Sequence, residues 1–381
     1  MDSTLISVVC VMNSLCPKAE KSDKCVSIRE CSRIVSAEKK KERLRMFSSF
    51  NTLNDILSVP GMRKWFHFLY AEEQFEWFPR ELWDQPLRLA AFRGQTPWGG
   101  NLQGIAEQMI DTANLVLELQ AGKRQCLHLH DWNAWEPEEG ASLQDPEQTF
   151  IITPPTDVNA DTPGPALIIC PGGGYEFVSF QNEGTPIQIL AEKKGYVSFI
   201  LRYRVAPSRY PEPQMDLLET IRYVRENAAK YHVDPDRIGI VGFSAGGHLC
   251  ASSAALYQTL LPEGRPNAVA LGYPVITFEK EVTHEGSALA LIGKDDAALR
   301  RELSVENLIT SDYPPAFAWA CRDDGTVPCE NTERLEAKLE EAGVTHACHY
   351  YPTGGHGCGL AYDNSAWKWS VEMFSFLEKN L

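Results

Sequence analysis

Past residue 122, short apolar runs alternate with amphipathic segments, and this alternation restricts the fold more than any other feature of the chain. Runs rich in β-branched residues predict strands, and apolar residues three and four positions apart predict helices. The predicted strands are 126–132, 149–155, 166–171, 196–205 and 237–244, and the predicted helices are 185–195 and 213–231. The pattern predicts a mainly parallel α/β sheet with helices on both faces, whose ligand sites lie beyond the carboxyl ends of the strands.

The strand predicted at 237–244 ends in Ser244, which stands between Gly242 and Gly246. A sharp turn from strand into helix would hold the serine hydroxyl above the sheet in a strained, positive-φ conformation. The residues two before and two after it would then approach too closely to tolerate side chains. The helix that starts there would point backbone N–H groups toward a developing negative charge. Ser244 is therefore a candidate nucleophile.

A second glycine-rich segment, CPGGGYEF at 170–177, directly follows another predicted strand. Consecutive glycines let backbone N–H groups approach a substrate carbonyl closely, as the second half of an oxyanion hole requires. Together with the serine pentapeptide, this segment predicts an acyl-transfer site at the sheet edge more specifically than the pentapeptide does alone.

A serine nucleophile also needs a base and an acid that orients the base, and in this fold they follow in the order Ser, Asp, His. The strand predicted in 314–328 runs into the carboxylate pair Asp323 and Asp324, and the strand predicted in 349–359 is followed by His356. Both ends are expected at the edge that carries Ser244.

None of the other histidines is the expected base. His248, one helical turn after the serine, is expected to be a packed or capping residue. His128 and His130 share a predicted strand face with Cys126, a grouping that also fits a metal site, although an ordinary half-exposed strand face is the favoured interpretation. His284 is a candidate pocket residue only. We therefore expect no metal ion in the site.

Seven stretches of the chain resemble one known family: PGGGY, EGTPIQILAEKKGYVSFILRYRVAP, YPEPQMD, DPDRIGIVGFSAGGHL, HEGS, DDGTVP and YPTGGHGCGL. By these motifs the segment from about Pro165 to Leu381 resembles the α/β-hydrolase esterases, in particular the bacterial acetyl and acetylxylan esterases of the carbohydrate-esterase-like group. Where lipase-type relatives have a histidine before the three glycines, this chain has Pro171. That departure resembles the acetyl-esterase variant of the motif.

The resemblance implies an α/β-hydrolase fold and a serine carboxylesterase that acts on short-chain esters, acetyl esters first, with acetylated sugars among the candidate substrates. The residue roles that it implies are nucleophile Ser244, acid Asp323 and base His356, with oxyanion donors Gly173, Gly174 and Ala245. It implies no cofactor, because the hydrolysis needs only these side chains, backbone amides and water.

Three alternatives stay open. A serine peptidase would use the same three side chains, although such relatives carry a large gating domain for which this chain has no room. An acyltransferase would differ only in excluding water from the acyl-enzyme. A non-catalytic binding protein on a hydrolase scaffold would be expected to lose at least one of the three side chains.

Composition excludes several other classes of function. A formal net charge of −15 repels phosphate backbones, so nucleic acid is not an expected partner. No apolar run approaches the length of a membrane span, and the expected location is cytoplasmic. Eleven cysteines are scattered, and those past residue 100 fall mostly in predicted strands and helices, which favours reduced, packed thiols. The oligomeric state is left open.

Three regions are expected along the chain. Residues 1–45 lack aromatic residues and end in a charge run, so we expect a disordered leader, or a true start at Met46. Residues 46–122 are expected to form a helical accessory segment, and 123–381 the catalytic domain. The accessory segment should pack on that domain, and a pocket lid is its alternative role. Its aromatic residues include Trp65, Phe66, Phe68, Phe75, Trp77, Phe78, Trp83 and Trp98.

Overall fold

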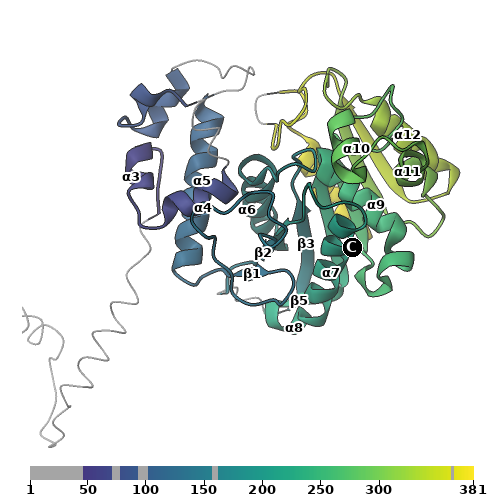
Figure 1. Ribbon diagram of the computed structural model, residues 1–381, viewed down its shortest axis with the longest axis horizontal. Helices are drawn as coiled ribbons and strands as arrows, with labels where there is room; N and C mark the ends of the chain where they lie inside the picture. The colour runs from purple at the N-terminus through teal and green to yellow at the C-terminus, as the bar shows by residue number, and fades with distance from the viewer. Residues whose placement is uncertain (1–45, 71–77, 93–101, 157–161, 362–363) are drawn as a thin grey trace, which may run out of the picture. The chain divides into compact units, whose positions relative to one another are not determined.

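The computed structural model describes residues 46–70, 78–92, 102–156, 162–361 and 364–381 (Figure 1). The leader expected at 1–45 lies outside the described residues. Residues 46–381 make up one compact unit. Its buried apolar side chains form one continuous cluster that includes both the helical segment and the sheet.

A single eight-stranded sheet organises the described part of the chain. The strands are β1(Cys126–His128), β2(Phe150–Ile152), β3(Gly164–Cys170), β4(Val197–Arg202), β5(Val233–Phe243), β6(Ala268–Gly272), β7(Ala316–Cys321) and β8(His346–Tyr351). Their order across the sheet is β1-β2-β4-β3-β5-β6-β7-β8. β1 and β2 pair antiparallel with each other, as β2 does with β4, and the remaining neighbours are parallel. The predicted mainly parallel sheet is confirmed.

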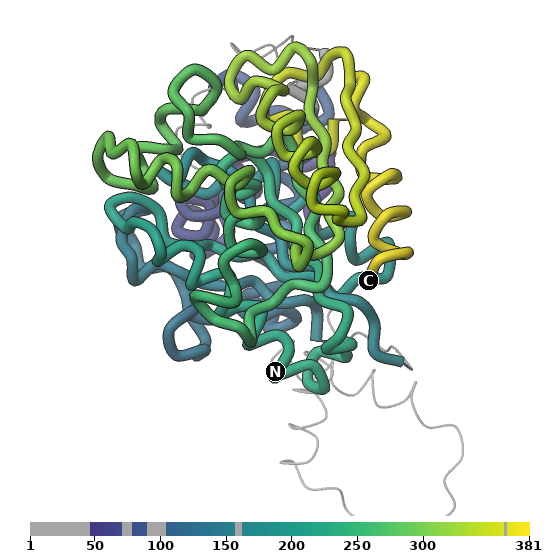
Figure 2. The backbone as a smooth tube through the Cα atoms, turned by 90° about the vertical axis from the view of Figure 1, so that its right-hand side faces the viewer, coloured from purple at the N-terminus to yellow at the C-terminus, as the bar shows by residue number. Residues whose placement is uncertain are grey.

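Helices cover both faces of this sheet (Figure 1). They are α6(Thr185–Lys193), α7(Glu212–Glu226), α8(Ala228–Tyr231), α9(Ser244–Leu260), α10(Glu285–Ile292), α11(Ala297–Leu303), α12(Glu330–Glu341) and α13(Trp369–Asn380). In α7, Leu217, Ile221 and Val224 recur three and four positions apart and are buried, which is why this segment forms an amphipathic helix. The C-terminal helix α13, yellow in Figure 2, packs against β6 and β7.

The central strands read as continuous apolar runs because both faces of the sheet are covered. All residues of β7 are buried, as are Ala166–Cys170 in β3. A parallel sheet with helices on both faces needs such strands, whereas an open face would require alternating polar residues.

The segment before β1 is helical, with α3(Leu53–Leu57), α4(Met62–Leu69) and α5(Leu102–Gln120), and short 3-10 turns at Arg80–Leu82 and Leu87–Phe92. The indole of Trp135, past β1, meets Trp65 at 6.1 Å and Phe68 at 5.7 Å between ring centroids, and stacks on Phe150 of β2 at 4.5 Å. The aromatic side chains of α4 therefore pack against the sheet region, as expected. Phe75, Trp77 and Trp98 lie outside the described residues.

The described residues include seven of the eleven cysteines. The seven cysteines among them are free thiols, and Cys126, Cys170, Cys250 and Cys321 are buried. No helix in the described ranges is both long and apolar enough to cross a membrane.

Candidate active site

The turn from β5 into α9 places Ser244 at the carboxyl end of the central strand. Ser244 has φ 53°, the left-handed conformation predicted for it. A Cβ on Gly242 would lie 2.1 Å from the carbonyl oxygen of Gly246, and one on Gly246 would lie 2.2 Å from that of Cys170. Because both separations are far below van der Waals contact, the turn needs glycine at these two positions.

The Ser244 hydroxyl begins a chain of hydrogen bonds that links three loops. Ser244 Oγ lies 2.8 Å from Nε2 of His356, and Nδ1 of the same ring lies 2.8 Å from Oδ2 of Asp324. The carboxylate can only accept, so Nδ1 carries the ring proton and Nε2 is free to accept from the serine. The Asp324 side chain is fully buried, whereas the His356 side chain is 17% exposed.

The expectation that Asp323 faces the histidine is wrong, because the structure places Asp324 there. Asp323 Oδ1 instead accepts the N–H of Gly355, at 2.8 Å. The second oxygen of Asp324 accepts the N–H groups of Thr326 and Val327, both at 2.9 Å. β7 ends at Cys321, so both aspartates lie in a turn where strand alternation no longer sets side-chain direction.

The glycine-rich loop lies directly against the serine. A Cβ on Gly172 would lie 2.9 Å from Ser244 Cβ. The Gly172 N–H is already used, since it donates to Oε2 of Glu183 at 2.7 Å. The N–H groups of Gly173 and Gly174 donate to no protein acceptor within the described residues, and Ala245 lies in the first turn of α9, where N–H groups lack intrahelical partners. The predicted donors are thus brought to the serine end of the sheet.

Sequence reasoning missed a buried pair beneath this site, Glu183 and Tyr273. Glu183 lies in the π-helical turn Phe180–Gly184, and its Oε1 accepts a hydrogen bond from the Tyr273 hydroxyl at 2.6 Å. The hydroxyl oxygen of Tyr273 in turn accepts the N–H of Gly359 at 3.1 Å. The Tyr273 ring packs edge to face on His356, with centroids 4.9 Å apart. Burial raises the pKa of Glu183. The carboxyl therefore connects the glycine-rich loop to the histidine loop.

Only one sequence signal pointed to Glu183. Glu183 is the first residue of EGTPIQ, at the start of one of the long stretches that resemble the esterase family, where a solvent-exposed acid would be expected. Its partner Tyr273 lies on a different strand end, so the pair becomes visible only in the folded chain.

Two further histidines lie near the site. His248 is buried, as expected, between the Tyr175 hydroxyl and the carbonyl of Leu303, each 2.9 Å from a ring nitrogen, and burial lowers its pKa to about 4. His284 caps α10 and bonds Ser287, and its ring would lie 3.9 Å from a Cβ on Gly174. His284 thus borders the glycine-rich loop, in keeping with a pocket residue.

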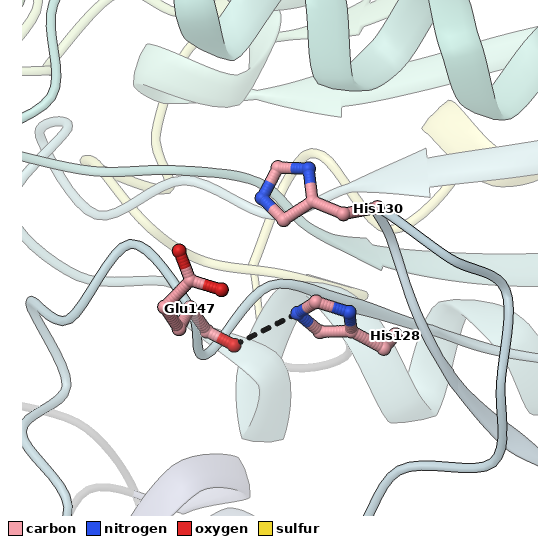
Figure 3. Close-up of side chains that lie close together, drawn as sticks. All are labelled: His128, His130 and Glu147. Atoms are coloured by element: carbon pink, nitrogen blue, oxygen red, sulfur yellow. Dashed lines mark hydrogen bonds between the residues drawn. The ribbon is translucent and has the colours of Figure 1, made fainter.

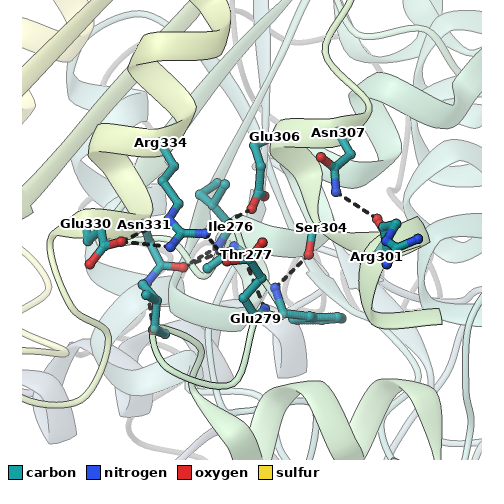
Figure 4. Close-up of polar contacts among 12 residues, drawn as sticks. Ile276, Thr277, Glu279, Arg301, Ser304, Glu306, Asn307, Glu330, Asn331 and Arg334 are labelled. Atoms are coloured by element: carbon teal, nitrogen blue, oxygen red, sulfur yellow. Dashed lines mark hydrogen bonds and ion pairs between the residues drawn. The ribbon is translucent and has the colours of Figure 1, made fainter. Parts of the chain in front are cut away.

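A cavity of about 560 Å³ lies elsewhere, beside α12 and the turn Val305–Asn307. Figure 4 shows the polar network next to it, in which Arg334 pairs with Glu279 and Glu330. Asn331 Oδ1 accepts the N–H groups of Ile276 and Thr277. The network fixes the chain just after Val275, whose N–H donates to the Ser244 carbonyl. It supports the serine turn from outside the site.

Known proteins with similar sequences and structures indicate the family to which this site belongs. The BD-FAE family model matches residues 152–339. The crystal structure of an acetyl ester-xyloside bifunctional hydrolase from Caldicellulosiruptor lactoaceticus is similar, with 33% identity and a TM-score of 0.57. That match covers 67% of this chain and 95% of the other.

Two curated relatives match a smaller share. The acetylxylan esterase of Xylanibacter ruminicola is 34% identical over 203 residues, which is 52% of this chain and 42% of that protein. The endo-1,4-beta-xylanase B of Butyrivibrio fibrisolvens is 32% identical over 231 residues, 57% of this chain and 36% of that protein. The match therefore spans less than half the length of either curated relative.

Proposed function

This chain belongs to the α/β-hydrolase esterase family that the BD-FAE model represents, and from that premise we propose that it is a serine carboxylesterase that hydrolyses short-chain esters, acetyl esters first. The observation that carries the proposal is the continuous hydrogen-bond chain from Ser244 through His356 to Asp324, at 2.8 Å per link. A strained nucleophile, a base within reach of it and a buried acid behind the base are the parts that acyl transfer requires.

In the first half-reaction, Ser244 Oγ attacks the ester carbonyl carbon while its proton moves to Nε2 of His356. Asp324 accepts the Nδ1–H bond, which holds the ring in this tautomer and stabilises the imidazolium. The oxyanion accepts hydrogen bonds from the amides of Gly173, Gly174 and Ala245. Collapse of the tetrahedral intermediate expels the alcohol, which takes the proton from Nε2 and leaves the acyl group on Ser244.

Water completes the cycle in the second half-reaction. It loses a proton to Nε2 as its oxygen attacks the acyl carbon, and collapse returns the proton to Ser244 Oγ and releases the acid. Every proton is carried by one imidazole.

The substrate class rests on two observations. A net charge of −15 disfavours anionic polymers and suits neutral esters. Two relatives carry acetyl esters of xylan or xylosides in their names, an acetylxylan esterase and an acetyl ester-xyloside hydrolase. Acetylated sugars are therefore the natural substrates that we propose.

The test combines active-site labelling with a substrate series. A fluorophosphonate probe should label Ser244 and no other residue in the wild-type protein. Turnover of nitrophenyl esters should fall from acetyl to butyryl to octanoyl, and Ser244→Ala should lower kcat by at least about a thousandfold. The matched control is Ser253→Ala in the same helix, which removes a buried hydroxyl that has no hydrogen-bond partner among the described residues.

Three results would contradict the proposal. Label on another residue, or none on folded protein, would reject the nucleophile. Faster turnover of the octanoyl ester would indicate a lipase-like pocket. Faster cleavage of a nitroanilide than of the matching ester would point to a peptidase.

A further inference from the structure

Strand β1 ends at His128, and the loop that joins it to β2, residues 129–149, carries His130 on its outgoing arm and Glu147 on its returning arm. His128, His130 and Glu147 each offer a ligand atom, and these atoms lie within 4.8 Å of one another. Figure 3 shows the three side chains facing one another. Cys126, on the strand face that the sequence predicts for both histidines, is buried in the core and is not part of this cluster.

The antiparallel ladder at the base of the loop holds the two arms together. His128 pairs with Phe150, and the N–H of Leu129 donates to the carbonyl of Thr149 at 3.1 Å. On the returning arm, the Glu147 N–H donates to Asp145 Oδ1 at 3.0 Å, and Arg202 binds the carbonyl of Gln148. The cluster therefore sits on a fixed backbone, although the side chains of His130 and Glu147 are exposed.

His128 lies between two oxygens that can only accept. Its Nδ1 is 3.3 Å from Asp131 Oδ1, and its Nε2 is 3.1 Å from the carbonyl oxygen of Glu147 (Figure 3). A neutral imidazole has one N–H and can donate to only one of them. When Nδ1–H donates to Asp131, the lone pair of Nε2 faces the lone pairs of the Glu147 carbonyl oxygen, and the two atoms repel each other. A cation bound next to them would be attracted by both.

We propose that His128, His130 and Glu147 bind a divalent transition-metal ion of the zinc class. Imidazole nitrogens and a carboxylate are ligands that such ions prefer, and water would complete the shell at this exposed position. Ligand atoms of one zinc ion lie about 3–3.5 Å apart, given bond lengths of about 2.0–2.2 Å. The three ligand atoms lie within 4.8 Å of one another, and rotations of the exposed His130 and Glu147 side chains would bring them to the separation that one zinc ion requires.

Surrounding charges favour a cation. Asp131 orients His128 as carboxylates do behind metal-bound histidines, and Asp145 adds a second negative charge next to Glu147. The opposing cations are Arg204, which is paired with the buried Asp216 at 2.6 Å, and Arg202, which donates to the carbonyls of Leu143 and Gln148. Bound metal would fasten the two arms of the loop and so raise its resistance to unfolding.

The test titrates the full-length protein, stripped with a chelator, with Co²⁺ and then Zn²⁺. We expect one cobalt site whose visible spectrum lacks thiolate charge-transfer bands, displacement by zinc, and a higher Tm with zinc. His130→Ala and Glu147→Gln should each raise the Kd at least about tenfold and abolish the Tm shift. Their Tm without metal should equal that of the wild type, because both side chains are exposed.

The matched control is His232→Asn, which removes an exposed imidazole outside the cluster at φ 54°, a conformation that asparagine tolerates. It should bind cobalt like the wild type. Absence of cobalt binding, or binding with thiolate bands that neither His130→Ala nor Glu147→Gln weakens, would overturn the proposal.

Discussion

Two adjacent carboxylates at the end of β7 have different environments, and the difference assigns their roles. Asp324 accepts two backbone N–H groups with one oxygen and contacts His356 with the other, whereas Asp323 accepts the N–H of Gly355. The motif DDGTVP alone favoured the first aspartate. The turn hydrogen bonds to Thr326 and Val327 reverse that assignment because they aim the second one inward.

The pair predicts unequal effects of one substitution. Asp324→Asn preserves the turn acceptor but presents an amide to His356, and we expect kcat/KM for nitrophenyl acetate to fall by about a thousandfold or more. Asp323→Asn should lower the same kcat/KM by less than about tenfold, because it removes the charge of an acceptor that holds one loop N–H and leaves the His356 contact intact. A larger loss in Asp323→Asn would restore the original assignment.

Glu183 is the other residue whose role depends on its contacts. Glu183→Ala leaves the Gly172 N–H and the Tyr273 hydroxyl without their buried acceptor, at a cost of about 1–3 kcal/mol each. We expect a lower Tm and a kcat reduced at least about tenfold with a smaller change in KM, since the glycine-rich loop shifts. Glu183→Gln keeps one side-chain oxygen that can accept from one of the two donors, and it should restore most of the Tm and most of kcat. Wild-type kcat in Glu183→Ala would show that the carboxyl does not position the loop.

At the scale of elements, the local sequence pattern was sufficient to predict the strands and the residues that directly follow them. The strands ending at Cys170, Phe243, Cys321 and Tyr351 were predictable from apolar runs, and in a parallel sheet their carboxyl ends share one edge. Ser244, His356 and the glycine-rich loop followed from that. Contacts between distant segments were not predictable, which is why Glu183 with Tyr273 was missed, and Glu147 beside His128.

Helix α5 carries a titratable group that predicts a pH effect on stability. Burial raises the pKa of Asp111 from 3.8 to about 6, with Lys193 opposing and Glu107 reinforcing the shift. Between these values the folded chain keeps a proton that the unfolded chain releases, so the free energy of unfolding falls as pH rises through this window. The cost of ionised Asp111 is absent below about pH 4 and complete above about pH 7.

Asp111→Asn removes this cost. Urea unfolding should show the variant more stable than the wild type by about 1–2 kcal/mol at pH 7.5, less than the roughly 3 kcal/mol of the full pKa shift because Asp111 is only partly buried, and the gain should vanish by pH 4. A gain of the same size at both pH values would mean that the effect is packing rather than ionisation.

On the scale of the whole unit, the 129–149 loop connects the helical segment to the sheet. Lys64 of α4 pairs with Glu136 at 2.9 Å, and His67 contacts the carbonyl of Ala141 at 3.0 Å. Trp135 stacks on Phe150 and meets two α4 rings. The loop is thus one attachment of the helical segment, and the contacts of α5 with α6 and with the turn Phe180–Gly184 are others.

Truncating the central indole tests that connection. Trp135→Ala removes one ring from a cluster of four aromatic rings and leaves a cavity at their junction, so urea unfolding should show a loss of about 2–4 kcal/mol. Trp367→Ala is the matched control, because that indole is 53% exposed and its loss should cost no more than about 0.5 kcal/mol. Ester turnover well below the unfolding transition should persist in both variants, since in the described residues the ring contacts of Trp135 go to Trp65, Phe68 and Phe150, and the Trp367 ring contacts Lys368. Equal stability of the two variants would show that the loop does not fasten the segment. A loss of turnover without a loss of stability in Trp135→Ala would instead favour the lid role for the helical segment.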